Sequence, residues 1–403
     1  MQDKMLKSVE FFSGAGGLAL GLHQAGFEHL ALVEWDHNAA ETLKQNSASI
    51  LGIDVERVFC IDAREFDCSK FTGKVDLLAG GPPCQPFSNA GKNMGHRDPR
   101  DMFPVFLDAV KVIKPKAVLV ENVKGLLREK FSDYLEYIIR RLMFPEAKLK
   151  KDDFREDLLT LRKLQYSDFK KQDTYKVTYQ LVDAADHGIP QRRARVLFSA
   201  FRSDLGIDPR HLSATHSKES LLIDQFITGE YWKRHGIRPN NQLTARDQRE
   251  LALLKNKIKQ NLLPSEGLKP WRTVRDAISD LPKPVPRGTL PKIANHIQHP
   301  GARIYIGHVG SFYDYPAKAL KAGTHGTPGG ENILYENDKK VRYFTTREAG
   351  RLHTFPDEWI FLGPWGSCIR HVGNAVPVQL GKKFGDYLHS ELMKHHLRNV
   401  KSS

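Results

Sequence analysis

The stretch SVEFFSGAGG, residues 8–17, decides the fold, because a short apolar run leads directly into a glycine-rich turn and a helical pattern. Short β-rich runs that alternate with helical patterns are typical of βαβ units in a parallel sheet. Further runs of this kind follow at 29–35, 57–62, 75–81, 116–123, 175–184 and 192–201. The sequence therefore predicts an α/β protein with a doubly wound, mostly parallel sheet of about seven strands.

The size and charge of the chain narrow its class. Its 403 residues exceed the roughly 250–300 at which one hydrophobic core stops growing, so two domains are expected. The 61 Lys and Arg residues against 47 Asp and Glu give a net charge of +14, which favours a polyanionic partner, nucleic acid first. A secretory leader and a run of about 18 apolar residues are both absent, so we expect a soluble, intracellular protein.

The cysteine pattern argues against a disulfide-rich protein and against a zinc-binding protein. No two cysteines form a CxxC pair, and their spacing suggests neither a disulfide framework nor a zinc site. This usage fits a reducing compartment, and we expect no metal. The four cysteines are Cys60, Cys68, Cys84 and Cys368.

The alternation of strands and helices stops after residue 201. Residues 202–340 contain 22 Lys and Arg against 14 Asp and Glu, so this third of the chain carries +8 of the net charge. We expect a second, smaller and irregular domain there. A helical pattern resumes after 340 with an apolar stripe that should pack on the N-terminal sheet, so the first domain combines 1–201 with 341–403. The stripe consists of Val376, Leu380, Phe384, Leu388 and Leu392.

Two segments between the strands are also helical in pattern. Residues 132–143 predict a helix over the sheet, capped by Ser132 and with Leu135, Ile138, Ile139 and Leu142 on its apolar face. Residues 145–173 are dense in charges of both signs and predict a solvated helical insertion without chemistry of its own.

The ends of the first three strands suggest a nucleoside pocket. The turn at residues 12–17 would let a cofactor approach backbone N–H groups at a helix N-terminus, although such turns also serve as plain packing devices. Glu34 ends the second strand, where an acid can accept hydrogen bonds from ribose hydroxyls, and Trp35 beside it could stack on a purine. Asp62 ends the third strand and would accept from an adenine amino group. These side chains should meet at the carboxyl edge of the sheet.

The next strand ends supply reactive groups to the same edge. Cys84 follows two prolines in GGPPCQPFS; a lone cysteine is usually a small buried hydrophobe, but this one stands in a stiff loop beside the pocket. Glu121 ends the fifth strand, where a helix cap or a solvated acid is the alternative. In QRRAR, Arg193 and Arg195 alternate on one strand face, which either is solvated or aims both guanidinium groups into one cleft. A thiolate, an acid and a cation are what covalent activation of a pyrimidine requires.

With these residues in place, the chain resembles the cytosine-C5 DNA methyltransferases of bacterial restriction-modification systems. The resemblance covers nearly all of the chain outside 202–340. It implies a Rossmann-like fold that uses S-adenosylmethionine to methylate a cytosine flipped out of double-stranded DNA, with 202–340 as the target-recognition domain. The matching blocks, in order, are FFSGAGG, VEWD, GGPPCQPFS, DPRDMF, ENVKGLL, QRRAR, RYFTTREAGRLHTFPDEW and GNAVPV.

The resemblance also implies residue roles. Cys84 would be the nucleophile, Pro83 would bound the pocket, Glu121 would contact N3 and the amino group, and Arg195 would lie near O2 with Arg193 helping to position them. Residues 85–102 resemble a mobile loop that closes over DNA, in which Gly91, Lys92, Gly95 and Arg97 suit a flexible, phosphate-touching lid. The residues expected around the cofactor are Phe12, Gly14, Gly16, Gly17, Leu18, Glu34, Trp35, Asp62, Ala63, Asn374 and Val376.

The chain departs from the family pattern only locally. DPRDMF lacks the glycine that often follows its arginine, and the insertion at 145–173 is unusual, which puts local loop geometry in doubt but removes no catalytic group. As the resemblance implies, we expect a stand-alone monomer in the bacterial cytoplasm, associated with the nucleoid through DNA. A cognate restriction endonuclease in the same system would not bind it directly, and no membrane partner is expected.

Three alternatives stay open at this point. A transfer-RNA cytosine-C5 methyltransferase would use nearly the same motifs, although the basic region favours DNA. A nicotinamide-dependent oxidoreductase would explain the glycine turn and Glu34 but leave Cys84 unused, and a catalytically silent DNA-binding regulator would leave Cys84 and Glu121 unused. The target sequence cannot be read, because basic residues of the recognition region suit phosphates as well as bases: Arg272, Arg275, Arg303 and Lys321.

Overall fold

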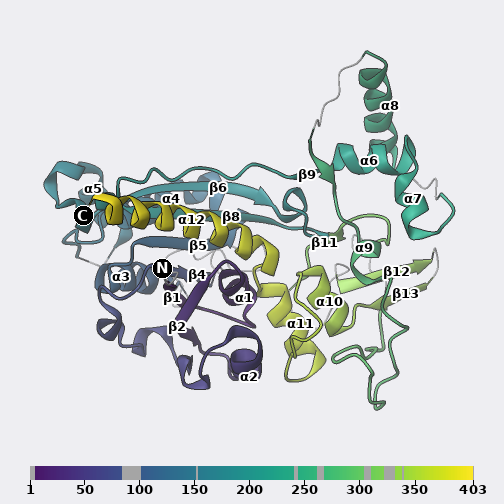
Figure 1. The fold of residues 1–403 in the computed structure, drawn as a ribbon, viewed down its shortest axis with the longest axis horizontal. Coiled ribbons are helices and arrows are strands. Elements are labelled where there is room, and N and C mark those ends of the chain that lie inside the picture. The colour runs from purple at the N-terminus through teal and green to yellow at the C-terminus, as the bar shows by residue number, and fades with distance from the viewer. Residues whose placement is uncertain are drawn as a thin grey trace.

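The computed structural model has a central sheet of seven strands in the order β3-β2-β1-β4-β5-β8-β6 (Figure 1). Its N-terminal strands pair in parallel, and β8 pairs antiparallel with both β5 and β6. This confirms the predicted doubly wound, mostly parallel sheet. The strands are β1 Leu6–Phe11, β2 Phe27–Glu34, β3 Val58–Cys60, β4 Leu77–Gly80, β5 Ala117–Val123, β6 Tyr175–Asp183 and β8 Ala194–Arg202.

The structure describes most of the chain, and every statement below concerns these residues. They are 5–83, 101–150, 153–239, 244–260, 267–303, 310–321, 332–337 and 340–402. Cys84 and residues 85–100 of the predicted loop therefore lie outside the described residues.

Helices cover both faces of the sheet. On one face, α3 (Phe103–Ile113) and α4 (Ser132–Met143) pack on alternate residues of β1, β5 and β8. On the other, α1 (Gly17–Gln24) and the long α12 (Val378–Ser402) pack on the residues between them (Figure 1). The predicted C-terminal stripe is buried in this second layer. Both ends of the chain thus build one hydrophobic layer under the sheet.

Two details differ from the sequence-based expectation. The face that α4 buries is formed by Tyr134, Tyr137, Ile138, Arg141 and Leu142, and its cap position is Phe131. Ser132 makes no capping hydrogen bond, because it already lies inside the first turn. The insertion contains one α-helix, α5 (Phe154–Lys163), and two short 3-10 helices, and α5 is less solvated than predicted because Leu158 and Leu161 are buried with residues of α4.

The region after β8 consists of short elements that lie beside one end of the sheet (Figure 1). A few of its residues form a small core of their own around Trp232 and Trp271. Others, in α9 and near β11, share a hydrophobic cluster with α10 and α11. The elements are β9 His216–Ser217, α6 Lys218–Phe226, α7 Glu230–His235, α8 Ala245–Lys259, β10 Lys269–Pro270, α9 Val274–Ile278, β11 Ala317–Lys318, β12 Ile333–Asn337 and β13 Lys340–Tyr343.

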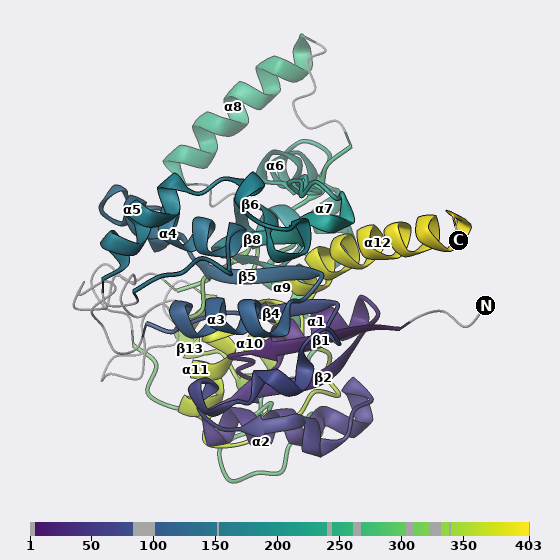
Figure 2. The ribbon, with the colours of Figure 1, turned by 90° about the vertical axis from the view of Figure 1, so that its left-hand side faces the viewer.

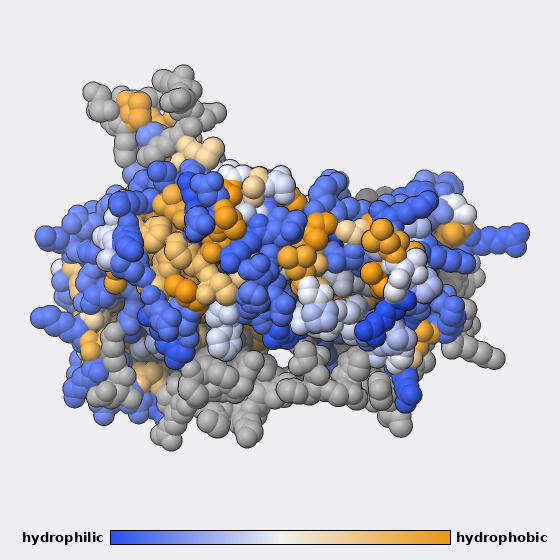
Figure 3. Space-filling view, turned by 90° about the horizontal axis from the view of Figure 1, so that it is seen from below, coloured by the Kyte–Doolittle hydropathy of each residue, from blue (hydrophilic) through white to orange (hydrophobic). Residues whose placement is uncertain are grey.

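The return to the sheet uses α10 (Thr346–Leu352) and α11 (Trp365–Asn374), followed by α12; α2 (His37–Asn46) follows β2. Within the described residues, no helix is long and apolar enough to cross a membrane. Seen from below, most of the surface is hydrophilic, and apolar side chains gather mainly over one half (Figure 3).

Candidate active site

The predicted site residues meet along one edge of the sheet. In Figure 2 the amino end of β1 and the C-terminal part of α12 lie on the same side of the sheet, so the carboxyl edge faces the opposite side. The strand order reverses between β1 and β4, which is where ligands bind in open α/β sheets. The turn after β1, the ends of β2, β4 and β5 and the start of β8 all belong to this edge.

The three glycines of the first turn differ in their surroundings. A Cβ on Gly16 would lie 2.7 Å from side-chain atoms of Leu43 and Trp359, and one on Gly17 would lie 2.2 Å from the Val376 backbone oxygen. A Cβ on Gly14 would meet nothing within 4 Å. Gly16 and Gly17 thus permit close packing of protein on protein, whereas the open position at Gly14 is where a ligand could approach the backbone.

Phe12, which starts the turn, has a φ of 58°, in the left-handed region that non-glycine residues rarely adopt. Such strain persists only where surrounding structure enforces it, and it clusters at functional sites. Leu18, on α1, is buried in the cluster that α1 forms with α12 and Val376. Its side chain supports the turn from below.

Glu34 ties the turn to the end of β2. One carboxylate oxygen accepts from the Gly14 N–H at 2.7 Å, and the other accepts from the Asp36 N–H at 2.8 Å. Burial raises the pKa of Glu34, and the two backbone hydrogen bonds oppose that rise. A carboxylate has about four acceptor sites, so capacity for ribose hydroxyls remains. Trp35 beside it is 74% exposed, with its ring free for stacking.

Asp62 is held in place by a neighbour. The Arg64 guanidinium donates to both of its carboxylate oxygens, at 2.9 and 2.5 Å, and the Arg64 N–H donates as well. The hydrogen bond from the Arg64 side chain lowers the pKa of Asp62. Ala63 is buried in the short helix that Asp62 begins. Any base amino group would therefore share Asp62 with Arg64.

The segment 373–376 packs against the glycine turn. Asn374 is exposed at the end of α11, and the Val376 backbone lies against Gly17. The buried Arg193 guanidinium donates to Gly373 O at 2.8 Å and to Ala375 O at 3.0 Å. It also donates to Leu320 O at 3.4 Å.

Glu121 and Arg195 form the second half of the site. The Arg195 Nε lies 2.6 Å from Glu121 Oε1, in an ion pair whose side chains are 14% and 9% exposed. A Cβ on Gly81 would lie 3.2 Å from Glu121 Oε2, so the carboxylate faces the turn that leads to Pro83 and Cys84. Pro83 is half-buried at the last described position before Cys84.

Arg193 does not share this opening with Arg195. It is 1% exposed, and its guanidinium is bonded to three backbone carbonyl groups. The prediction that both guanidinium groups point into one cleft is wrong for Arg193, because the chain leaves strand geometry between β7 (Gln191–Arg192) and β8. Its position suits a supporting role for the segment 373–376.

Sequence reasoning missed three buried polar residues at this edge. Asn122 donates to Pro82 O at 3.1 Å and so anchors the turn before Cys84. Gln191 accepts from Leu320 N at 3.3 Å and lies 3.2 Å from a ring nitrogen of His353. Glu10 is fully buried in β1, and its Oε2 has no hydrogen-bond partner among the described residues. Only Glu10 left a signal in the sequence, as a charge inside an apolar run.

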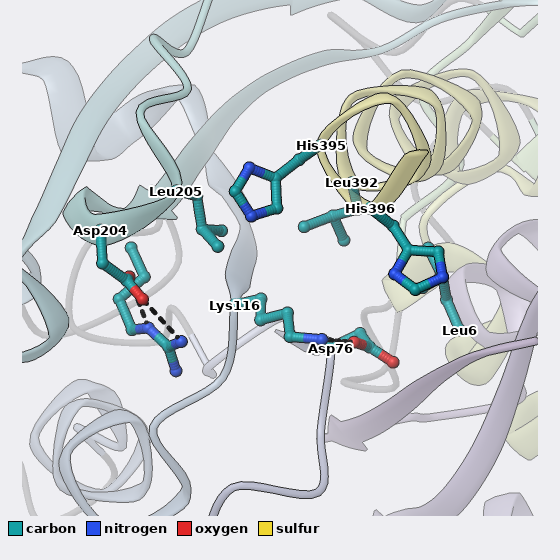
Figure 4. Close-up of a pocket in the computed structure, with 9 residues that line it drawn as sticks. Leu6, Asp76, Lys116, Asp204, Leu205, Leu392, His395 and His396 are labelled. Atoms are coloured by element: carbon teal, nitrogen blue, oxygen red, sulfur yellow. Dashed lines mark hydrogen bonds and ion pairs between the residues drawn. The ribbon is translucent and has the colours of Figure 1, made fainter. Parts of the chain in front are cut away.

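The described residues contain no cluster of three or more potential ligands that could hold a metal ion. A cavity of about 220 Å³ lies at the opposite edge of the sheet, lined by residues such as Leu6, Asp76 and His395 (Figure 4). Its charged groups pair with one another: Lys116 lies 2.7 Å from Asp76, and Arg202 lies 2.8 Å from Asp204. This cavity is separate from the site built at the carboxyl edge.

The carboxyl edge of a doubly wound sheet, where ligands bind in such folds, here brings together a glycine turn, the buried Glu34 and the Glu121–Arg195 ion pair. The sequence model of the C-5 cytosine-specific DNA methylases matches residues 6–144 and 153–390. The chain therefore belongs to this family and is a DNA (cytosine-5)-methyltransferase, which excludes the oxidoreductase alternative.

Similar proteins agree with that assignment. The type II methyltransferase M.PspPI of a Psychrobacter species is 32% identical over 385 residues, 94% of this chain and 77% of that protein. M.Eco47II of Escherichia coli is 31% identical over 94% of this chain and 77% of its own length. In fold alone, the chain is similar to the Dnmt2 methyltransferase of S. pombe, with a TM-score of 0.54 at 16% identity, covering 96% of this chain and 99% of that one.

Proposed function

We propose that the chain transfers the methyl group of S-adenosylmethionine to C5 of a cytosine flipped out of duplex DNA, through a covalent bond to Cys84. The observation that carries the proposal is the buried Glu121–Arg195 pair, which faces the Gly81 turn just before Cys84. The Gly14 and Glu34 pocket lies at the same edge of the sheet. Methyl donor and base would therefore be held side by side.

The residues present fit the cofactor. The open position at Gly14 admits a ligand to the backbone, Glu34 has acceptor capacity for ribose hydroxyls, and Trp35 offers a ring face for adenine. The unpartnered oxygen of Glu10 belongs to β1, the strand that leads into the same turn. When bound, S-adenosylmethionine supplies a methyl group activated by its positively charged sulfur. Phe12, Leu18, Asp62, Ala63, Asn374 and Val376 would complete the pocket.

Glu121 and Arg195 would recognise the flipped cytosine. In its protonated form the carboxyl group donates to N3 and accepts from the exocyclic amino group, and the guanidinium lies near O2, so both stabilise the negative charge that thiolate addition at C6 produces. The ion pair fixes both side chains before the base arrives, which reduces the cost of organising them. Arg193 acts through the backbone of 373–375 as a positioning residue, and Pro83 bounds the pocket.

The covalent step uses Cys84. Its thiolate would form a bond to C6, which raises the electron density at C5 so that C5 can take up the methyl group, while the sulfur–methyl bond of the donor breaks and S-adenosylhomocysteine leaves as the product. Loss of the C5 proton then restores the C5–C6 double bond and expels the thiolate. No redox partner is needed.

Residues 202–340 would form the target-recognition domain, with 1–201 and 341–403 as the catalytic domain. The +8 charge of 202–340 supports double-stranded DNA as the partner. Relatives that are type II methyltransferases support a place in a restriction-modification system, beside an endonuclease that need not bind this chain. We also propose that the enzyme acts as a monomer in the bacterial cytoplasm, associated with the nucleoid.

Labelled S-adenosylmethionine tests the substrate. We expect label in duplex DNA and none in transfer RNA, and bisulfite sequencing of the DNA should find methylated cytosines in one sequence context. Label that enters only transfer RNA would overturn the DNA proposal, and a protein that labels neither would be a silent binder.

Exchange of segment 202–340 tests the recognition domain. A chimaera that carries the segment from M.PspPI should methylate a different sequence while it binds the cofactor as before. An active chimaera that keeps the original preference would place recognition elsewhere in the chain.

A further inference from the structure

Helix α8 (Ala245–Lys259) stands away from the rest of the molecule, beyond α6 (Figures 1 and 2). It is attached along one narrow side, where Leu251 and Leu254 are buried. Fifteen residues rise about 22 Å at 1.5 Å per residue, so most of this length faces solvent. A projection of this kind adds surface to the recognition region without adding to its core.

The base of α8 is fixed by a polar junction that uses up its acidic residues. Lys218 of α6 pairs with Asp247 at 2.6 Å and with Glu250 at 2.5 Å. Asp247, only 5% exposed, also accepts from the Tyr315 hydroxyl at 2.9 Å. These bonds fix the orientation of the helix, and Lys218 together with Arg246 balances its two carboxylates.

The remaining charges of α8 are all positive. Arg246, Arg249 and Lys257 follow one face at spacings of three, seven and eleven residues, a ridge that also contains Leu253, 61% exposed. Arg246 lies 2.9 Å from Glu250, whereas Arg249 and Lys257 form no ion pair with any described residue. Lys255 and Lys259 lie on a different face and are exposed.

The helix dipole explains only part of this pattern. Cations in the last turn stabilise a helix, which accounts for Lys257 and Lys259. It does not account for Arg249 in the middle or Arg246 in the first turn, where a cation is unfavourable. The i,i+4 pair with Glu250 accounts for Arg246, so Arg249 is the cation that neither effect explains, and a polyanion that lies along the ridge would explain it.

We propose that the ridge of Arg246, Arg249 and Lys257 binds the sugar–phosphate backbone of duplex DNA, apart from the flipped base. This inference rests on the proposed function and deepens it. The ridge spans about 16 Å, the length of roughly five phosphates along one strand. Such contacts orient the DNA but carry no sequence information.

The test compares two double variants of the same helix. Arg249→Gln with Lys257→Gln removes two charges from the ridge, and Lys255→Gln with Lys259→Gln removes two from the other face. Glutamine preserves helix propensity, and circular dichroism checks that both variants fold. Binding to a mixed-sequence 40-base-pair duplex is measured between 50 and 200 mM NaCl, together with KM and kcat for DNA methylation.

Loss of two phosphate contacts lowers the log–log salt slope by about 1.8, so the affinity change over this range shrinks about 12-fold in the ridge variant. KM for DNA should rise while kcat stays the same, because the ridge is remote from the reacting base. The variant with Lys255→Gln and Lys259→Gln should retain more than half of the salt slope that the ridge variant loses. The ridge inference would be overturned if the wild type and both variants had the same salt slope, or if both variants lost the same amount of slope. The same slope in all three proteins is expected if the true partner of the ridge is an acidic protein.

The two proposals fail differently. If the wild-type enzyme neither binds nor methylates duplex DNA, the proposed function is wrong and the ridge falls with it. If the wild type methylates DNA and the ridge variant has the same salt slope as the wild type, only the ridge inference is wrong.

Discussion

The carboxyl edge of the sheet and the region 202–340 differ in how they hold charged groups. At the edge, two buried groups are fixed by backbone partners: Glu34 accepts from two N–H groups, and Arg193 donates to three carbonyls. In the other region, ion pairs range from the largely buried Lys218–Asp247 to the exposed Lys233–Glu230. Buried groups with fixed partners set the geometry of a reaction, whereas exposed pairs contribute little to stability and leave cations available to a partner.

This contrast predicts where substitutions do the most damage. Changing one buried group at the edge leaves a partner unsatisfied, and it should affect one step of the reaction specifically. Changing one exposed cation of 202–340 should weaken the affinity for DNA only in part, because each phosphate contact contributes one share of the salt-dependent affinity. Substitutions at different groups of the edge should therefore affect different steps of the reaction, and the same effect at every group would remove the contrast with the region 202–340.

The largest effect is expected at Cys84. Duplex DNA with 5-fluorocytosine at the target, incubated with S-adenosylmethionine, should yield a protein–DNA adduct that survives denaturation, because fluorine cannot leave C5 as a cation. Cys84→Ser should give no adduct and no turnover, since a serine hydroxyl is a far weaker nucleophile near neutral pH. Denaturing electrophoresis detects the adduct, and peptide mass spectrometry locates it.

The other cysteines provide matched controls for this trap. Burial raises the pKa of Cys68 to about 11 and that of Cys368 to about 11, so both remain thiols at neutral pH. Serine at either position, or at Cys60, should leave the adduct intact. An adduct that maps to any of them would remove Cys84 from the mechanism.

The next largest effect is expected at Glu121. Glu121→Gln keeps the shape of the side chain but removes the charge that pairs with Arg195 and the acid that we propose contacts the base. Turnover should fall about 10²- to 10⁴-fold, the usual contribution of a positioned acid or base. Calorimetry should find S-adenosylmethionine affinity nearly unchanged; a comparable loss of cofactor binding would show that the base and cofactor pockets have been confused.

Sequence patterns located this edge because strand ends are regular. Once the runs around Glu34, Asp62 and Glu121 are recognised as parallel strands, their carboxyl ends must meet. The role of Arg193 could not be read in this way, because its partners are carbonyls of residues 320, 373 and 375, far away along the chain. The buried face of α4 was misjudged because tyrosines and an arginine, rather than the aliphatic residues alone, fill the space beside α5.

The region 202–340 was harder to read from sequence, for a physical reason. Its elements are short, and several of its residues join the hydrophobic cluster of α10 and α11, so no repeating apolar period marks them. Arg275, one candidate base reader, instead pairs with Asp314 at 2.6 Å. Composition predicted the partner of this region, but only tertiary structure shows which cations remain free.

A smaller effect is expected at Glu34. Glu34→Ala removes the hydrogen bond from the Gly14 N–H, which holds the turn to the end of β2, and the one from the Asp36 N–H, together with the proposed acceptor for ribose hydroxyls. S-adenosylmethionine affinity should weaken by roughly 1.5–3 kcal/mol, about 10- to 150-fold, as for a hydrogen bond to a charged group. Turnover at saturating cofactor should change much less. A large loss of turnover with intact cofactor affinity would contradict the division between Glu34 and Glu121.

The smallest effect is expected at Glu10, and it concerns stability rather than activity. Burial raises the pKa of Glu10 well above its usual value, so the folded protein takes up a proton more readily than the unfolded chain does. By linkage, the stability that Glu10 contributes is present below its unfolded pKa and is lost as pH rises through the folded pKa. Urea unfolding of the cofactor-free protein should therefore show a free energy of unfolding that falls from pH 5 to pH 8 more steeply in the wild type than in Glu10→Gln. The exposed pair partner Lys233 offers a control, since Lys233→Gln should leave the pH dependence of the wild type unchanged. If the free energy of unfolding changed with pH in the same way for the wild type and Glu10→Gln, the Glu10 carboxyl would ionise freely in the folded state. Glu10 would then not be an example of a buried ionisable group at this edge.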